Sequence, residues 1–190
     1  PAYADRMSAN LESKREIAQV AASLVPDKAK VIIDFGTTAF CVAEALANHN
    51  GLMVVTSSLQ AANFLAGRNG NEVVLMGGQL HASEGATLGR DTTKMLENYF
   101  VDFSFVGAGV ISSHPWLMDF SREAAELRAL MLRQAVNSVV LADHTKFNRT
   151  AAYRVANFEQ AAFLITDRKL DARTAQTLRP FEGEILTADR

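Results

Sequence analysis

The stretch Val31-Ile32-Ile33-Asp34-Phe35-Gly36-Thr37-Thr38 places an apolar run, a glycine and two threonines in direct succession. The β-branched apolar residues at its start are typical of a buried strand that ends near residue 35. Gly36 supplies the backbone freedom that a tight turn needs, and a helical pattern follows over 39–47. The stretch therefore predicts a strand, a turn and a helix in immediate succession, which is the repeating unit of an α/β fold.

The same succession recurs along the chain. Short apolar runs predict strands, and apolar residues at helical spacing predict helices. The predicted strands are 31–35, 52–56, 72–76, 103–106, 138–142, 162–166 and 184–187, and the predicted helices are 13–25, 39–47, 58–66, 91–98 and 121–135. This alternation predicts an α/β fold with a mostly parallel sheet and helices on both faces. The longest stretches without either pattern, 79–90 and 111–120, are candidate lids or interface arms.

The composition is that of an ordinary globular domain. A chain of 190 residues that is 48% hydrophobic and 21% charged favours one domain with a substantial core. The net charge of −2 offers no general attraction to nucleic acid or to an anionic membrane. The single cysteine, Cys41, is interpreted as a buried helix residue, and its lack of an internal disulfide partner fits a cytoplasmic protein. No apolar run reaches the roughly 20 residues of a membrane helix. The histidines lack metal-ligand spacing, so we expect no metal or cofactor.

Small and polar residues follow the predicted strands, at the edge where ligands bind in open α/β sheets. Residues 34–38 are the sharpest case. Asp34 ends the strand, Gly36 lets a ligand approach the backbone, and Thr37 and Thr38 add hydroxyls beside the free N–H groups of a helix N-terminus. These features suit a phosphate cradle. A tight turn with a threonine N-cap explains the same residues.

Other strand ends offer candidates that each have a structural alternative. Ser57 and Ser58 could reach a ligand or cap the next helix. Gly77 and Gly78 suit a turn with positive φ, and residues 107–109 (GAG) suit close ligand approach or a bend.

Charged residues near the later strands add two further candidate positions. Asp143 and Lys146 lie in a polar turn just after the strand 138–142, where they could face a ligand or solvent. Glu126 lies in the helix 121–135 close to Arg122 and Arg128, where a solvated surface acid is the ordinary interpretation.

Taken in order over residues 14–187, these motifs resemble the C-terminal effector-sensing domain of DeoR-family transcriptional repressors. Residues 34–38 (DFGTT) are similar to the family's Asp-Ser-Gly-Thr-Thr, and residues 54–59 (VVTSSL) to its Val-Val-Thr-Asn-Ser-Leu. Residues 75–78 (LMGG) resemble its glycine pair, and residues 141–147 (LADHTKF) resemble its Leu-Ala-Asp-Ser-Ser-Lys-Phe. No single motif is decisive, but the ordered set is specific.

The resemblance implies a fold like that of ribose-5-phosphate isomerase and the CoA-transferases. It implies a domain that senses a phosphorylated sugar or related phosphorylated metabolite and thereby alters operator binding. It also implies a homo-oligomer and a winged helix-turn-helix that precedes this chain and alone contacts DNA. Residues 1–12 would then be a linker and 13–190 the sensing domain. The expected ligand-binding residues are Asp34, Gly36, Thr37, Thr38, Ser57, Ser58, Gly77, Gly78, Gly107, Ala108, Gly109, Glu126, Asp143 and Lys146.

Two departures from the family pattern affect the expected ligand. Gly109 stands where the family commonly has an aspartate, and Ala124 stands at the first acid of its Glu-Ala-Glu. A pocket with fewer carboxylates makes fewer bonds to sugar hydroxyls. The sequence therefore favours a smaller, differently oxidised or more anionic ligand.

Two other functions remain open. The first is a sugar-phosphate isomerase-like enzyme in which Glu126, Asp143 and Lys146 act as acid–base groups, although Gly109 removes an acid that such a pocket would be expected to have. The second is an oligomerisation module with a vestigial pocket.

Overall fold

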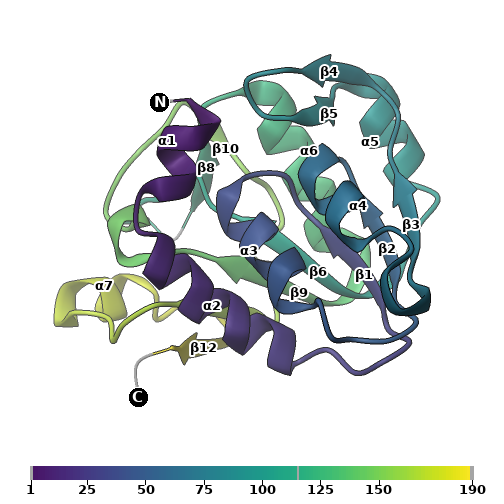
Figure 1. The fold of residues 1–190 in the computed structure, drawn as a ribbon. Helices are drawn as coiled ribbons and strands as arrows, with labels where there is room; N and C mark the ends of the chain where they lie inside the picture. Colours follow the sequence, from purple (N-terminus) through teal and green to yellow (C-terminus); the bar gives the residue numbers. More distant parts are fainter. Residues whose placement is uncertain (1, 115, 189–190) are drawn as a thin grey trace.

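A computed structural model describes residues 2–114 and 116–188, and a seven-stranded sheet forms its centre (Figure 1). All neighbouring strands in the sheet are parallel, in the order β12-β11-β9-β6-β1-β2-β3. The strands are β1 (Lys30–Ile33), β2 (Met53–Thr56), β3 (Glu72–Leu75), β6 (Val101–Gly107), β9 (Ala135–Leu141), β11 (Phe163–Thr166) and β12 (Glu184–Thr187). The predicted parallel α/β fold is confirmed.

Helices cover both faces of this sheet, which explains the apolar strand sequences. On one face, Ile17 and Val42 pack with Ile33 of β1. On the opposite face, Leu127 packs in the same core cluster as Ile32 of β1. The first face carries α2 (Leu11–Ser23), α3 (Thr37–Ala45) and α4 (Leu59–Leu65), and the second carries α5 (Arg90–Leu96) and α6 (Arg122–Arg133). Within the described chain, no helix combines the length and apolarity needed to cross a bilayer.

The two stretches predicted to be irregular contain short strands. Stretch 79–90 forms an antiparallel hairpin of β4 (Gln79–His81) and β5 (Ala86–Leu88) and ends at the start of α5. Stretch 111–120 contributes β7 (Val110–Ile111) and β8 (Leu117–Asp119) to a small antiparallel sheet with β10 (Tyr153–Arg154). Strands of two or three residues are too short to produce a readable alternation, so the sequence pattern missed them.

The remaining elements are short and were also missed. They are α1 (Tyr3–Ser8), α7 (Ala172–Thr177) and the 3-10 turns η1 (Arg68–Gly70), η2 (His144–Lys146) and η3 (Phe158–Gln160). Part of the range 1–12, expected as a linker, is thus helical. It contacts the rest of the domain through an ion pair of 2.8 Å between Arg6 and Glu84.

The strand order reverses between β1 and β6, and this reversal positions the site. The chain runs from β1 outward through β2 to β3, and β6, β9, β11 and β12 then extend the sheet on the other side of β1. Ligands of open α/β sheets bind at the carboxyl ends of the strands at such a reversal. Asp34 follows β1 there, and its Oδ2 accepts a hydrogen bond of 2.8 Å from the Gly107 N–H at the end of β6.

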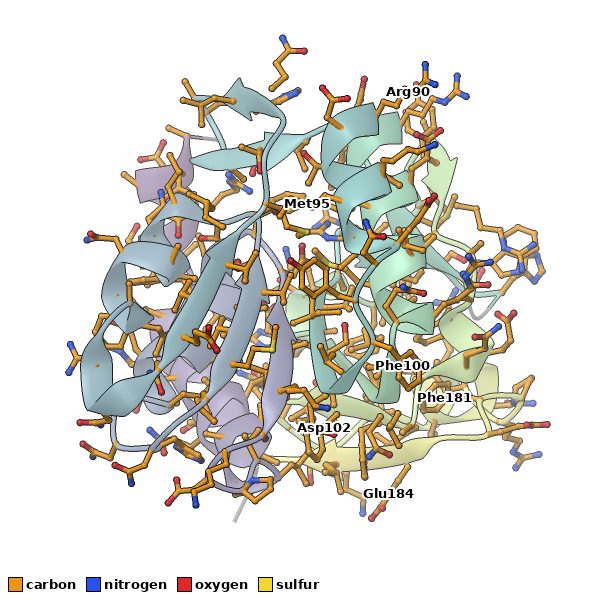
Figure 2. All side chains as sticks on the ribbon, turned by 90° about the vertical axis from the view of Figure 1, so that its right-hand side faces the viewer. Arg90, Met95, Phe100, Asp102, Phe181 and Glu184 are labelled. Carbon is orange, nitrogen blue, oxygen red and sulfur yellow. The ribbon has the colours of Figure 1, made fainter. Side chains whose placement is uncertain are left out.

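The outer surface at the amino ends of the strands carries exposed apolar side chains. Phe100 precedes β6, lies close to Asp102 in Figure 2 and is 61% exposed. Val136 of the neighbouring β9 is 66% exposed. In contrast, Met95 of α5 points back toward the sheet and packs against the core (Figure 2).

Candidate ligand-binding site

A cavity of about 600 Å³ opens at the carboxyl ends of β1, β6 and β9. Its size lies within the range of small-molecule sites, about 300–1,000 Å³. Its walls come from α1 and α2, the start of α3, the β4–β5 hairpin, the end of β6, β8 and α6. The residues that line it are Arg6, Ala9, Asn10, Lys14, Phe35, Gly36, Thr37, Thr38, Ala39, His81, Ser83, Glu84, Leu88, Gly107, Ala108, Gly109, Asp119, Phe120, Ser121, Ala124, Arg128, Asp143, Thr145 and Lys146.

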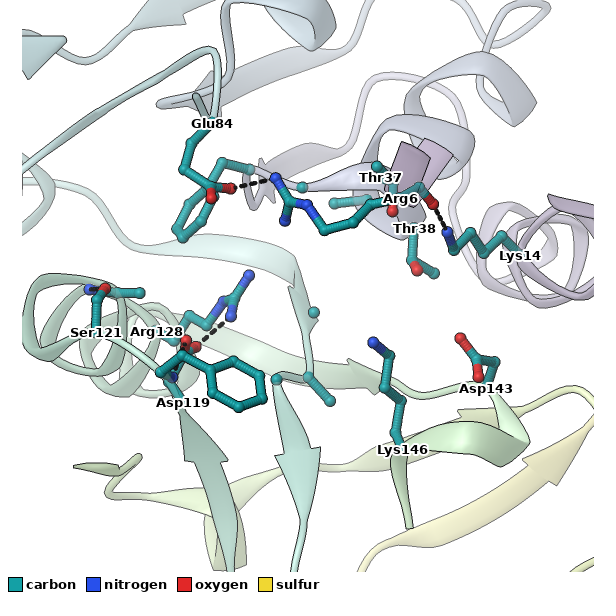
Figure 3. Close-up of a pocket in the computed structure, with 18 of the residues that line it drawn as sticks. Arg6, Lys14, Thr37, Thr38, Glu84, Asp119, Ser121, Arg128, Asp143 and Lys146 are labelled. Atoms are coloured by element: carbon teal, nitrogen blue, oxygen red, sulfur yellow. Dashed lines mark hydrogen bonds and ion pairs between the residues drawn. The ribbon is translucent and has the colours of Figure 1, made fainter. Parts of the chain in front are cut away.

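Arg128 of α6 lies at one end of the cavity between two carboxylates (Figure 3). Its Nε donates to Asp34 at 2.7 Å, and its Nη1 donates to Asp119. The guanidinium also stacks on the Phe35 ring, 4.5 Å from the ring centre. Asp34 has no exposed surface and accepts further hydrogen bonds from the N–H groups of Phe35 and Gly107. Asp34 therefore orients Arg128 from beneath the cavity.

Burial and charge act in opposite directions on the ionisable groups of this cluster. Burial raises the pKa of Asp34, and the nearby Arg128 cation opposes that shift. For Arg128, burial lowers the pKa, but the charges of Asp34 and Asp119 outweigh burial and leave the pKa above its usual value. The guanidinium is therefore a permanent cation held by two acids.

The other end of the cavity contains two lysines beside the start of α3. Gly36 is the N-cap of this nine-residue helix and has φ of +99°. The first N–H groups of a helix have no partner within the helix and carry its positive dipole end. Lys146 and Lys14 line the same space, and burial lowers the pKa of both ammonium groups, while Asp143 opposes the shift.

Asp143 fixes the turn that carries Lys146. Its Oδ1 accepts from the Thr145 N–H at 2.9 Å and from the Thr145 hydroxyl at 2.5 Å, which starts η2 after β9. In Figure 3 the Lys146 side chain extends into the cavity beside Asp143.

Residues near the N-terminus cover the cavity opposite the sheet. Arg6 of α1 pairs with Glu84 in the β4–β5 hairpin, and Figure 3 shows this pair across one side of the cavity. Nζ of Lys14 donates to the Arg6 carbonyl oxygen. Residues of α1 and α2 thus line the cavity, and α1 also contacts the β4–β5 hairpin.

Eight of the fourteen expected site residues line the cavity, and a ninth lies directly beneath it. The eight are Gly36, Thr37, Thr38, Gly107, Ala108, Gly109, Asp143 and Lys146, and the ninth is Asp34.

The structure does not bring the serine and glycine pairs to the cavity. Ser58 is the N-cap of α4 and accepts from the Ala61 N–H at 3.1 Å, while Ser57 is fully buried. Gly77 accepts a hydrogen bond from the Thr92 hydroxyl. A Cβ at Gly78 would lie 2.0 Å from the same hydroxyl oxygen, so α5 packs closely against this turn. Ser58 thus caps a helix and Gly78 has a φ of +144°, as the structural alternatives given above predicted, whereas Gly77 does not have a positive φ.

Glu126 also lies outside the cavity. Its side chain is 56% exposed and forms an ion pair of 2.8 Å with Arg122 on the preceding turn of α6. Glu126 is therefore a solvated surface acid, as the ordinary interpretation of its sequence position has it.

The sequence interpretation missed the cavity residues Arg128, Asp119, Lys14 and Arg6. One signal was available for Arg128, because it shares the helical spacing of the buried Ala124 and Met131. A charged residue within an apolar stripe indicates a paired or functional group. Asp119 had no comparable signal, since it lies in a stretch without pattern.

The carboxylate expected to be missing near position 109 is supplied from another strand. A Cβ built on Gly109 would lie 3.4 Å from Cγ of Asp119 and 2.5 Å from the Met118 carbonyl oxygen. Because β8 passes this close, glycine is required at 109, and Asp119 brings an acid to the same region.

Comparison with known proteins identifies similar regulators. A family model described as the DeoR C terminal sensor domain matches residues 9–168. The HTH-type transcriptional repressor CsqR of Escherichia coli is 32% identical over 97% of this chain and 71% of its own length. A glycerol-3-phosphate regulon repressor of Haemophilus influenzae is 31% identical over 86% of this chain and 64% of its own length. The chain thus spans about two thirds of these relatives.

A solved structure supports the fold assignment. The ribose 5-phosphate isomerase A of Methanocaldococcus jannaschii superposes with a TM-score of 0.52 at 20% identity, over 73% of this chain and 55% of that one. At this identity the likeness concerns the fold.

Proposed function

Because the chain belongs to the DeoR C-terminal sensor-domain family, we propose that its cavity binds a small phosphorylated metabolite as an effector. The observation that carries the proposal is the joint placement of Lys146, Lys14 and the start of α3 at one end of the cavity. Two ammonium groups and a set of unpaired helix N–H groups are suited to a phosphate dianion. The hydroxyls of Thr37 and Thr38 add donors in the same place.

The lining residues also suggest how binding would alter operator affinity. Lys14 and Arg6 belong to the segment that would lead to a DNA-binding module, and Lys14 donates to the Arg6 carbonyl oxygen. A phosphate that attracts Lys14 would compete with this contact and shift α1. Such a shift changes operator affinity only if the domain binds the ligand with different affinity in the two positions of α1. We expect it to act within a homo-oligomer in the cytoplasm, and the exposed Phe100 and Val136 offer apolar surface for assembly.

A regulatory role is favoured over catalysis. The enzyme alternative used Glu126, Asp143 and Lys146 as acid–base groups. Asp143 and Lys146 line the cavity, but Glu126 is paired with Arg122 outside it. The acids in the cavity wall are already engaged: Asp119 by Arg128, Glu84 by Arg6 and Asp143 by Thr145. The named relatives are repressors, which agrees with this view.

Calorimetric titration of the 190-residue chain with D-ribose 5-phosphate and glycerol 3-phosphate tests the proposal. We expect binding of at least one phosphoester and a loss of about tenfold or more in affinity in Lys146→Met, since charged hydrogen bonds contribute about 1.5–3 kcal/mol. Lys169→Met, at an exposed position outside the cavity, is the matched control. Absence of binding by both phosphoesters at millimolar concentration, or an equal effect of the two substitutions, would refute it.

A further inference from the structure

A second group of contacts lies just outside the cavity and meets at Asp167, which directly follows β11. Its Oδ1 accepts from the His144 N–H at 2.7 Å, and its Oδ2 accepts from Nδ1 of the His144 ring at 2.6 Å. The Asp167 side chain is only 2% exposed, whereas the His144 side chain is 32% exposed. Neither is among the described residues that line the cavity. The pair therefore lies behind the part of the wall that Asp143, Thr145 and Lys146 form.

The turn η2 connects this pair to Lys146. The Lys146 N–H donates to the Asp143 carbonyl oxygen at 3.0 Å, and residues three apart in a 3-10 turn lie on the same side of it. Asp143 and Lys146 therefore share the cavity side of η2. Asp167 holds both the backbone N–H and the ring of His144, so His144 cannot rotate without breaking two contacts. One carboxylate thus fixes which side of η2 faces the cavity.

The charge of Asp167 strengthens these contacts. Burial raises the pKa of Asp167, but hydrogen bonds from the His144 ring, the Ser13 side chain and the His144 N–H outweigh burial and leave the pKa below its usual value. The carboxylate is therefore ionised at neutral pH, and hydrogen bonds to an ionised acceptor are about twice as strong as those between neutral groups. Arg168 also contacts Oδ2 at 3.4 Å, but its side chain is 58% exposed and this contact adds little.

The same carboxylate lies next to the helix that carries the second lysine of the cavity. Ser13, whose side chain helps to lower the pKa of Asp167, directly precedes Lys14 in α2. Ile17 of α2 and Ile165 of β11 belong to one core cluster, so the helix packs against the strand that leads to Asp167. Asp167 therefore joins two segments whose lysines line the end of the cavity that we assign to phosphate.

The position of the Lys146 ammonium depends on the backbone of η2. Its side chain extends into the cavity in Figure 3, and within residues 2–114 and 116–188 Nζ has no hydrogen-bond partner. No side-chain contact therefore sets where the ammonium lies. The family motif Leu-Ala-Asp-Ser-Ser-Lys-Phe has a serine where this chain has His144. Because a serine side chain is shorter than the reach to Nδ1, the ring contact with Asp167 is a feature of this chain's own sequence.

We propose that Asp167 and His144 are positioning residues for Lys146, and that their contact fixes the direction in which η2 presents this lysine to a bound phosphate. The inference rests on the proposed phosphate site, and neither residue of the pair touches the ligand. Without the contact, η2 can adopt further arrangements, and only a fraction of them presents Lys146 correctly. The observed affinity then falls in proportion to that fraction.

Calorimetric titrations with D-ribose 5-phosphate and glycerol 3-phosphate test the proposal. His144→Ala removes the ring contact and should lower phosphoester affinity about fivefold, as expected from loss of one hydrogen bond. His144→Asn should bind within about twofold of the parent protein, because its side-chain N–H can donate to Asp167 in place of Nδ1. His49→Ala is the matched control: its ring also makes a hydrogen bond, of 2.9 Å to the Val25 carbonyl oxygen, but lies outside the cavity. The control should leave the affinity unchanged.

A double-mutant cycle shows whether the effect passes through Lys146. In the Lys146→Met background, His144→Ala should cost less than about twofold, since no ammonium group is left to position. An equal loss in both backgrounds would indicate a general disturbance of the cavity and would overturn the proposal. If the parent protein binds neither phosphoester, the phosphate site is refuted and this inference with it. If the parent binds and His144→Ala binds equally well, the positioning role alone is refuted.

Amide hydrogen exchange tests the positioning without any ligand. Asp167→Asn replaces one acceptor oxygen by an amide group that cannot accept from the His144 ring. Residues 143–147 should then exchange about fivefold faster, while residues 101–107 in β6 keep their protection. If exchange also rises in β6, the substitution has loosened the whole domain, and His144→Ala, at a partly exposed position, then decides. Unchanged exchange of residues 143–147 in the folded variant would overturn the inference.

Discussion

Replacement of Arg128 by methionine should destabilise the fold strongly. The substitution keeps an unbranched side chain on α6 but leaves Asp34 and Asp119 without their shared cation. Asp34 has no exposed surface, so water cannot replace the lost partner. Removal of one partner from a buried ion pair costs about 3–5 kcal/mol. For a domain of this size each kcal/mol lowers the melting temperature by about 2–4 °C, so we expect a decrease of about 6–20 °C.

Thermal and urea unfolding followed by circular dichroism measure this effect. Arg122→Met is the matched control because Arg122 lies on the same helix, also pairs with an acid and has a side chain that is 74% exposed. The control should leave the midpoint unchanged, since exposed ion pairs add little. Equal midpoints for Arg128→Met and Arg122→Met would refute the assignment of Arg128 as the partner of two buried acids.

The loss of stability in Arg128→Met should depend on pH, and this dependence provides a second readout. Loss of Arg128 removes the cation that opposes burial and leaves the Gly107 N–H hydrogen bond to oppose it, so the pKa of Asp34 in the folded state rises further. The folded variant then binds more protons than its unfolded chain between the two pKa values, so its stability falls as the pH rises through that window. The loss in free energy of unfolding relative to the parent protein should be smallest at acid pH and largest at neutral pH.

The remaining predictions concern a helix cap and the single thiol. Ser58→Ala should lower the free energy of unfolding by about 0.5–2 kcal/mol, since the Ser58 hydroxyl accepts from the Ala61 N–H, and leave phosphoester affinity in calorimetry unchanged. A large loss of phosphoester affinity would instead indicate that Ser58 contacts the ligand. Burial raises the pKa of Cys41 to about 11, so its thiol should resist a thiol-specific reagent at pH 8 until denaturant unfolds the chain. Rapid modification of the folded protein would contradict this placement.

Most of the fold followed from local pattern. Every strand of the parallel sheet was predicted, because strands buried on both faces have continuous apolar sequences such as residues 31–33. The elements that were missed have two to six residues, including β7, β10 and α7. Elements this short are held by their neighbours, and their own sequences carry little periodicity.

The candidate site was only partly predictable. Residues that follow strands at the reversal of strand order, such as Gly36 and Lys146, could be proposed because parallel strands bring their carboxyl ends to one edge. Ser57 and Gly78 also follow a strand, yet they lie in packed surroundings away from the cavity. Position after a strand identifies the edge of the sheet, but it does not say which side chains face open space.

The sequence by itself therefore determined the parallel sheet and the family, since each depends on motifs whose residues are neighbours along the chain. It also predicted Gly36, Thr37, Thr38 and Lys146 as site residues, but it missed Lys14, which lines the same end of the cavity. Only the tertiary structure brought Asp34, Asp119 and Arg128 together, from the end of β1, the end of β8 and the middle of α6. Arg128 is 94 positions from Asp34 and 9 positions from Asp119 along the chain. Contacts at these separations leave no local pattern in the sequence. The physical reason is that packing sets the direction of the guanidinium, and packing depends on the whole fold.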